Sequence, residues 1–136
     1  MFEKIDYKIL KPKQQEIYNF QKLSALLADY GFATMKLSDD WQSADFIAQH
    51  FDGETFLKVQ LKGRLTFDKK YCKKNILVGF PHKDDWYLYD HDALLDLFKD
   101  TYPKMVASVS WEERGNYSWP TLSKEHLLML QTYKLD

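Results

Sequence analysis

The sequence predicts an α/β (α+β) fold in which a central mixed β-sheet, with a β-hairpin at its core, is flanked by helices. Three features favour this architecture: a long segment of helical periodicity opens the chain, short strand-like segments fill its middle, and two helix-like segments close it. The 136 residues suit one domain, spanning 1–136, because no repeat or flexible linker divides them.

Residues 12–30 form the first predicted helix, in which apolar side chains recur at helical spacing. Pro12 suits its first turn, and Gly31 stands where a glycine commonly ends a helix. Three strands are predicted next, over residues 32–37, 44–51 and 54–67. The dipeptide Asp52-Gly53 between the second and third strands is typical of a two-residue hairpin turn.

The second half of the chain predicts two strands and two helices around an aromatic loop. The strands span residues 75–80 and 86–89. Pro81 ends the first of them, and Asp90 and Ser123 are positioned as N-caps of the two helices. The loop over residues 110–120 is rich in Trp and Tyr, which either close the core or stack on unpaired bases.

Composition narrows the class of protein. Hydrophobic residues make up 45% of the chain and charged residues 29%, which excludes disorder as its main state. No segment is apolar for long enough to span a bilayer, and charges interrupt the first residues where a signal peptide is apolar. We therefore expect a cytoplasmic protein with no membrane partner. The single cysteine, Cys72, excludes an internal disulfide.

The charge of the chain is unevenly distributed. Its net charge is −1, but residues 58–74 hold seven basic side chains and one acidic side chain, a local charge of +6. A basic stripe of this kind suits the phosphate backbone of a nucleic acid. A solvated lysine-rich loop is the simpler interpretation of the stripe taken alone.

The predicted hairpin brings three polar residues together. In the register set by the turn, Asp45 lies opposite Gln60. Lys62 falls on the same face because side chains alternate along a strand. The other face is apolar and is expected to face the core; it carries Ala44, Phe46, Ala48, Leu57, Val59 and Leu61.

An Asp carboxylate, a Gln amide oxygen and a Lys ammonium suit metal-assisted hydrolysis of phosphodiesters. Asp45, Gln60 and the backbone carbonyl of Leu61 offer hard oxygen ligands for Mg²⁺. Lys62 beside the metal can orient a water molecule and stabilise charge on a phosphate. An exposed Asp–Lys pair on a solvated sheet face is the alternative interpretation.

These residues resemble the core motif of the PD-(D/E)xK nuclease superfamily, which has the restriction-endonuclease-like fold. The match consists of Ser43-Ala44-Asp45, then the turn, then Val59-Gln60-Leu61-Lys62. The resemblance implies that Asp45 is the metal-binding acid, that Gln60 takes the second acidic position as in QxK variants, and that Lys62 is the catalytic lysine. It also implies a helix glutamate, for which Glu16 is the candidate.

The expected function is that of a metal-dependent endonuclease, a phosphodiesterase that uses Mg²⁺ or Mn²⁺ and acts on nucleic acid, with DNA as the first expectation. The residues expected to bind nucleic acid are Lys58, Arg64, Lys69, Lys70, Lys73 and Lys74. A domain this small grips two strands more easily as a homodimer. Two alternatives stay open: a non-catalytic nucleic-acid-binding domain of the same fold, and a protein-interaction module with no nucleic-acid role.

Overall fold

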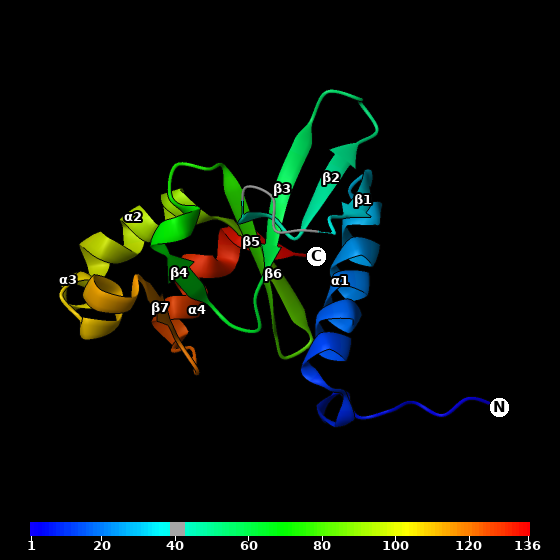
Figure 1. The fold of residues 1–136 in the computed structure, drawn as a ribbon, viewed down its shortest axis with the longest axis horizontal. Coiled ribbons are helices and arrows are strands. Elements are labelled where there is room, and N and C mark those ends of the chain that lie inside the picture. The colour runs from blue at the N-terminus through cyan, green and yellow to red at the C-terminus, as the bar shows by residue number, and fades with distance from the viewer. Residues whose placement is uncertain (39–42) are drawn as a thin grey trace.

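The computed structural model of the protein describes residues 1–38 and 43–136, with a six-stranded mixed sheet at its centre (Figure 1). The strand order is β1-β2-β3-β5-β6-β8; β3 and β5 run parallel, and the other neighbouring strands are antiparallel. The strands are β1 (Phe32–Lys36), β2 (Phe46–His50), β3 (Phe56–Leu61), β5 (Ile76–His82), β6 (Asp85–Asp90) and β8 (Lys134–Leu135). The predicted mixed sheet with a hairpin at its core is confirmed.

Helices cover both faces of this sheet (Figure 1). The helices are α1 (Pro12–Asp29) on one face, and α2 (His91–Thr101), α3 (Pro103–Val106) and α4 (Lys124–Leu130) on the other. A second sheet pairs β4 (Thr66–Asp68) with β7 (Asn116–Ser118). The short helical turns are η1 (Tyr7–Ile9), η3 (Lys69–Tyr71), η4 (Ser110–Arg114) and η5 (Gln131–Tyr133). Within the described ranges, no helix has both the length and the apolar character that crossing a membrane requires.

Each face of the sheet has its own apolar core. Under α1, Leu23 and Leu27 pack against inward-facing residues of the sheet, which are Phe46, Ala48, Val59 and Trp86. The larger core lies on the other face, where Val78 and Phe80 of β5 meet Phe98 of α2. This core also includes Trp111 and the partly buried Trp119, so the aromatic segment 110–120 closes the core.

The predicted helix ends are confirmed. Asp90 Oδ1 accepts a hydrogen bond from the Ala93 N–H at the start of α2, over 3.1 Å. Ser123 Oγ accepts one from the His126 N–H at the start of α4, also over 3.1 Å. Gly31 follows α1 with φ of 87°, a left-handed conformation that favours glycine.

Two predictions about the hairpin are wrong, although its register is right. The connection is a four-residue loop over residues 51–54, because the Asp52 carboxylate accepts hydrogen bonds from the Glu54 and Thr55 N–H groups (both 2.8 Å). The loop is longer than the predicted turn by one residue on each side, so the two strands keep the predicted register. The predicted strand 54–67 is also interrupted: β3 ends at Leu61, and β4 joins the second sheet.

The interruption follows from the parallel pairing of β3 with β5. Parallel neighbours need a connection of about a dozen residues or more, which here is the segment of residues 62–75, called the crossover below. Pro81 does not end β5 as predicted; it lies inside the strand, opposite Trp86. The Gly79 carbonyl points toward the β3 side of β5, where it accepts from the Lys62 N–H. The Pro81 nitrogen, two residues later, points to the same side, but β3 has already ended there, so no strand hydrogen bond is lost.

The predicted strand 44–51 starts later than expected. β2 begins at Phe46, and Ala44 packs in the larger core and not with Phe46 under α1. The backbone before β2 is irregular, with Ser43 at a positive φ of 65°. The aromatic segment likewise contains the elements η4 and β7, where the sequence predicts only a loop.

Candidate functional site

The candidate site lies where β2 begins and β3 ends. The two strands pair in the predicted register, with Phe46 opposite Val59. Asp45 directly precedes β2, and hydrogen bonds hold its backbone on two sides. Its N–H donates to the Val59 carbonyl over 2.8 Å, and its carbonyl accepts from the Leu37 N–H over 3.0 Å. Asp45 is therefore fixed beside the end of β3.

The Asp45 carboxylate is oriented by the backbone of β3. The Leu61 N–H donates to Asp45 Oδ2 over 2.8 Å in a partly buried position. A hydrogen bond to a carboxylate is charge-assisted and about twice as strong as a neutral one, so this contact directs the side chain. Leu61 thus takes part in the site through its N–H, and the metal-binding role of its carbonyl stays a prediction.

Gln60 contributes a buried oxygen, Oε1, that has no hydrogen-bond partner among residues 1–38 and 43–136. The residue is 8% exposed. It alternates along β3 with Val59 and Leu61, which pack under α1, so its side chain lies on the opposite face of the sheet. A buried acceptor without a partner costs about 1–3 kcal/mol, and a cation bound to it would remove that cost.

Lys62 follows at the same end of β3. Its N–H donates to the Gly79 carbonyl of β5 over 2.9 Å, which fixes the backbone where the strand ends. The Lys62 ammonium lies 5.5 Å from the centre of the Tyr71 ring, and the Lys70 ammonium lies 5.3 Å from the same ring. Tyr71 is 1% exposed, so the two lysines lie over one buried aromatic ring.

The crossover is attached to the segment that leads into Asp45. The Lys74 ammonium donates to Ser43 Oγ over 3.4 Å, and that hydroxyl donates to the Lys70 carbonyl over 3.5 Å. The Lys74 ammonium therefore lies beside the segment that leads into Asp45, whereas the Lys62 and Lys70 ammonium groups lie near the Tyr71 ring. Sequence reasoning did not identify Tyr71 and Ser43 as the groups that organise these lysines, because their contacts depend on the crossover.

Other basic residues of the stripe lie away from this cluster. The Lys69 ammonium lies over the Trp111 ring of η4, 5.4 Å from its centre. Arg64 and Lys73 are exposed on the crossover, and Lys58 lies within β3. The basic stripe is therefore divided between lysines that contact Tyr71 or Ser43 and basic residues elsewhere on the crossover and on β3.

The buried side chain of His91 holds the crossover against α2. His91 Nε2 accepts from the Asp68 N–H over 3.0 Å, so the ring proton resides on Nδ1, which donates to Asp92 Oδ1 over 2.9 Å. The Lys73 N–H donates to the other oxygen of Asp92 over 2.8 Å. Although burial acts in the opposite direction, these hydrogen bonds hold the pKa of Asp92 below its usual value.

Cys72, His91 and Asp92 bring ligand-type atoms within 4.8 Å of one another, a proximity that the sequence does not reveal. This group is nevertheless unsuited to a metal ion. Both ring nitrogens of His91 already make hydrogen bonds, so neither has a free lone pair. The pKa of the Cys72 thiol is raised, chiefly by burial, and a raised pKa disfavours the thiolate form that metals bind. The group is structural and positions the crossover.

Glu16 lies in the first half of α1, and its carboxylate is within 3.7 Å of the Lys13 ammonium and 4.0 Å of the Lys36 ammonium. Lys36 pairs with Phe46, the residue after Asp45, so Glu16 lies at the same end of the sheet as the site. Its side chain is 40% exposed and is engaged with lysines. A direct role for Glu16 at the metal stays a prediction.

Comparison with known proteins gives little beyond this geometry. No family model and no curated protein matches the chain. Among solved structures, the chain is similar to Hjc, a Holliday junction resolvase of the archaeal hyperthermophile Archaeoglobus fulgidus. The likeness has 15% identity and a TM-score of 0.41, and it covers 52% of this chain and 74% of the resolvase. At this level of likeness, the function rests on the chain's own residues.

Proposed function

We propose that the protein is a metal-dependent endonuclease that hydrolyses phosphodiester bonds of nucleic acid, with DNA as the first expected substrate and Mg²⁺ or Mn²⁺ as its metal. The observation that carries the proposal is the buried oxygen of Gln60, which has no hydrogen-bond partner in the described part of the chain. It belongs to the β3 segment whose next residue, Leu61, orients the Asp45 carboxylate. A hard cation satisfies both oxygens at once.

The donor set fits a weakly held divalent cation. Asp45 and Gln60 would hold it through their side-chain oxygens, and Leu61 through its backbone carbonyl. When bound, such a cation polarises a phosphate oxygen and lowers the pKa of a bound water molecule. Only one formal negative charge comes from these three groups, because Gln60 is neutral, so the affinity should be lower than in a site with two carboxylates.

The lysines supply the remaining chemistry. Lys62 is the group that would orient the attacking water molecule and hold its ammonium beside the developing negative charge of the phosphate. Lys70, near the same Tyr71 ring as Lys62, and Lys74, which contacts Ser43, would bind the phosphates next to the bond that is cleaved. Arg64, Lys69 and Lys73 extend this positive surface along the crossover, and Lys58 adds a charge on β3.

A cleavage assay tests the proposal. The full chain is incubated with duplex, single-stranded and branched DNA, and with RNA, with Mg²⁺, with Mn²⁺ and with a chelator. We expect cleavage that needs the metal and that Lys62→Met reduces by at least about a hundredfold. Lys134→Met, in β8 at the far edge of the sheet, is the matched control and should cleave normally. Binding of nucleic acid without metal-dependent cleavage of any form would contradict the proposal.

Metal binding is measured separately by calorimetry. Gln60→Glu has nearly the same shape and adds a negative charge, so it should bind Mn²⁺ more tightly than the wild-type chain. Asp45→Asn should bind it less tightly. Equal and negligible affinity in all three proteins would mean that the cation site does not exist.

A non-catalytic nucleic-acid-binding domain is the second candidate. The neutral Gln60 favours it, because a site with one carboxylate retains its metal poorly. In that case the lysines bind the phosphate backbone, and the Lys62→Met variant weakens binding by no more than the loss of one phosphate contact. The two candidates differ in the cleavage assay, where this one predicts intact nucleic acid under every metal condition.

A further inference from the structure

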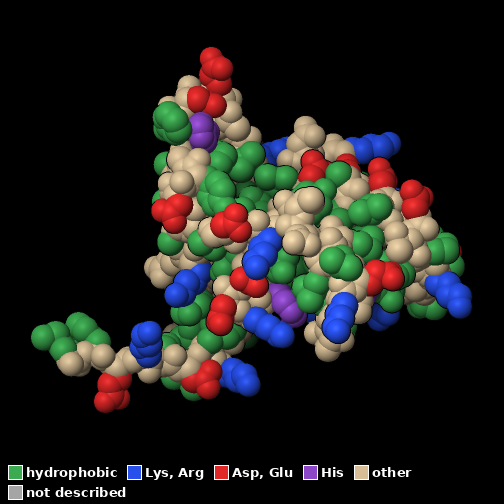
Figure 2. Space-filling view, turned by 180° about the vertical axis from the view of Figure 1, so that it is seen from behind, with side chains coloured by type: hydrophobic (Ala, Val, Ile, Leu, Met, Phe, Trp, Pro, Cys, Tyr) green, Lys and Arg blue, Asp and Glu red, His purple; other side chains and the backbone are tan. Residues whose placement is uncertain are grey.

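The first six residues, Met1–Asp6, form an extended arm whose apolar side chains are left in solvent. Met1 is 114% exposed, Phe2 is 94% exposed and Ile5 is 58% exposed. Figure 2 shows this arm projecting from the body of the protein, with hydrophobic side chains at its end. Three large apolar side chains in one short segment are unfavourable in water, so the arm has the composition of a segment that docks on a surface.

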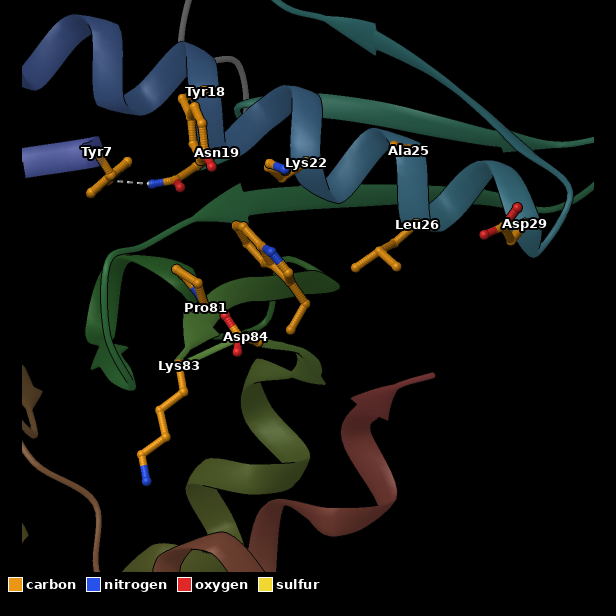
Figure 3. Close-up of a pocket in the computed structure, with 11 residues that line it drawn as sticks. Tyr7, Tyr18, Asn19, Lys22, Ala25, Leu26, Asp29, Pro81, Lys83 and Asp84 are labelled. Carbon is orange, nitrogen blue, oxygen red and sulfur yellow. Dashed lines mark hydrogen bonds between the residues drawn. The ribbon is translucent and has the colours of Figure 1, made fainter. Parts of the chain in front are cut away.

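A cleft of about 600 Å³ begins where the arm ends. Tyr7, the residue after the arm, lines the cleft, and its hydroxyl accepts from Asn19 Nδ2 of α1 over 2.9 Å (Figure 3). One wall is the exposed side of α1, with Lys22, Leu26 and Asp29. The other is formed by the ends of β5 and β6, with Pro81 and Trp86, and by the turn that joins them. The cleft lies on the α1 side of the sheet and is separate from the buried oxygen of Gln60.

The arm matches the cleft in length. Six extended residues span about 20 Å. The α1 wall runs from Tyr18 to Asp29, which at about 1.5 Å per residue is about 17 Å. An extended segment of six residues can therefore run along the α1 wall of the cleft.

The arm also matches the cleft in charge. The arm carries Glu3, Lys4 and Asp6, so acidic and basic side chains alternate between its apolar ones. The cleft carries two lysines and two aspartates, which are Lys22, Lys83, Asp29 and Asp84. Mixed charges on both surfaces can pair, whereas the balanced charge of the cleft does not suit a phosphate backbone.

We propose that the arm of one copy of the protein docks into this cleft on a second copy, and that two copies exchange arms around a twofold axis. The arm extends away from the body of its own molecule (Figure 1), so it is available to the cleft of a neighbouring molecule. Exchange of two arms covers six large apolar side chains of the dimer, three from each arm. Exchange of an identical segment is a low-cost route to a dimer.

Analytical ultracentrifugation of the full chain without nucleic acid tests the proposal independently of any nuclease activity. We expect a dimer whose dissociation constant rises at least about tenfold in Phe2→Ser combined with Ile5→Ser. Ala25→Arg, which narrows the cleft from the exposed side of α1, should have a similar effect. Phe51→Ser is the matched control: this side chain is 85% exposed at the hairpin tip, and its loss should leave the dimer intact.

A monomer at every concentration up to about 1 mM, or a dimer that the arm and cleft variants do not weaken, would overturn the proposal. A disulfide trap then distinguishes exchange from docking within one chain. Ile5→Cys and Ala25→Cys are placed on separate chains of different mass, each with Cys72→Ser, and the two are mixed under oxidation. A covalent heterodimer supports exchange. A bond that forms only when both cysteines are in the same chain contradicts it.

Discussion

The two faces of the β2–β3 hairpin are built from alternating residues of the same strands, yet they differ in what they bury. The face under α1 buries Phe46, Ala48 and Val59 completely, and all three are apolar. The other face buries Gln60, whose side-chain oxygen has no hydrogen-bond partner in the described residues. One face therefore stabilises the fold, and the other leaves a polar oxygen at some cost in stability.

The hairpin therefore stabilises the fold through one face and presents its polar candidate site on the opposite face. Burial of a phenylalanine side chain contributes several kcal/mol, which exceeds the cost of about 1–3 kcal/mol for one unsatisfied acceptor. Because the period of a strand is two residues, the strongly stabilised face also fixes the position of the polar one. A slip of register would lose both, so the apolar face determines where Asp45 and Gln60 lie.

The largest expected effect concerns the face under α1. Phe46→Ala removes a fully buried ring that packs edge-on against Phe20, with ring centres 5.0 Å apart. We expect the free energy of unfolding to fall by about 3–5 kcal/mol in a urea titration. Phe51→Ala, at a site 85% exposed, removes the same side chain and should change it by less than about 0.5 kcal/mol. Equal losses in the two variants would mean that the hairpin is not anchored under α1.

The next effect concerns the lysines on the polar side and is a change in affinity. Replacement of Lys69, Lys70, Lys73 and Lys74 by Gln removes the charges expected to contact about four phosphates. The wild-type protein should bind DNA with a log–log salt slope of about −3 to −4, and the slope of the variant should be clearly flatter. Replacement of Lys4, Lys8, Lys11 and Lys13 by Gln removes the same charge near the start of the chain. A similar change of slope in that control would indicate a non-specific charge effect.

A smaller effect of opposite sign is expected at Gln60. Gln60→Met keeps the length of the side chain and removes the buried oxygen that lacks a partner, so the protein should become more stable by about 1–3 kcal/mol in the absence of metal. Urea titrations with and without Mn²⁺ measure this. The wild-type chain should gain stability from the metal, and the variant should not. A less stable variant in metal-free buffer would show that the oxygen has a favourable contact after all.

The sequence predicts one face of the hairpin better than the other. The position of the Asp52-Gly53 turn gave the correct register, and the apolar alternation on both strands agreed with it, because one face had to be buried. The organisation of the polar side depends on the crossover, which folds back so that Lys74 reaches Ser43 and the Tyr71 ring lies beside Lys62. Such contacts join segments with no shared periodicity, so no local pattern indicates them.

The smallest expected effect concerns the attachment of the crossover and depends on pH. Asp92 accepts hydrogen bonds from the His91 ring and the Lys73 N–H, and its pKa is lowered in the folded protein. A lowered folded-state pKa means that the ionised carboxylate stabilises the fold above the unfolded pKa of about 4, and that this contribution is lost as the pH falls through the folded value. Because the side chain is 43% exposed, water screens the interaction, and the contribution should stay below about 1 kcal/mol.

Urea titrations of the wild-type protein and of Asp92→Asn between pH 7 and pH 3 measure this contribution. At pH 7 the variant should be the less stable protein, and the gap should narrow as the pH falls below about 4, because the wild-type carboxylate then becomes neutral as well. Asp96→Asn is the control, at an exposed position one turn further along α2. It removes the same charge as Asp92→Asn without a contact to His91 or Lys73, so its loss of unfolding free energy relative to the wild-type protein at pH 7 should be smaller. If the difference in unfolding free energy between the wild-type protein and Asp92→Asn does not change with pH, Asp92 holds the crossover through shape and neutral hydrogen bonds. Its charge then contributes nothing to the stability of the crossover.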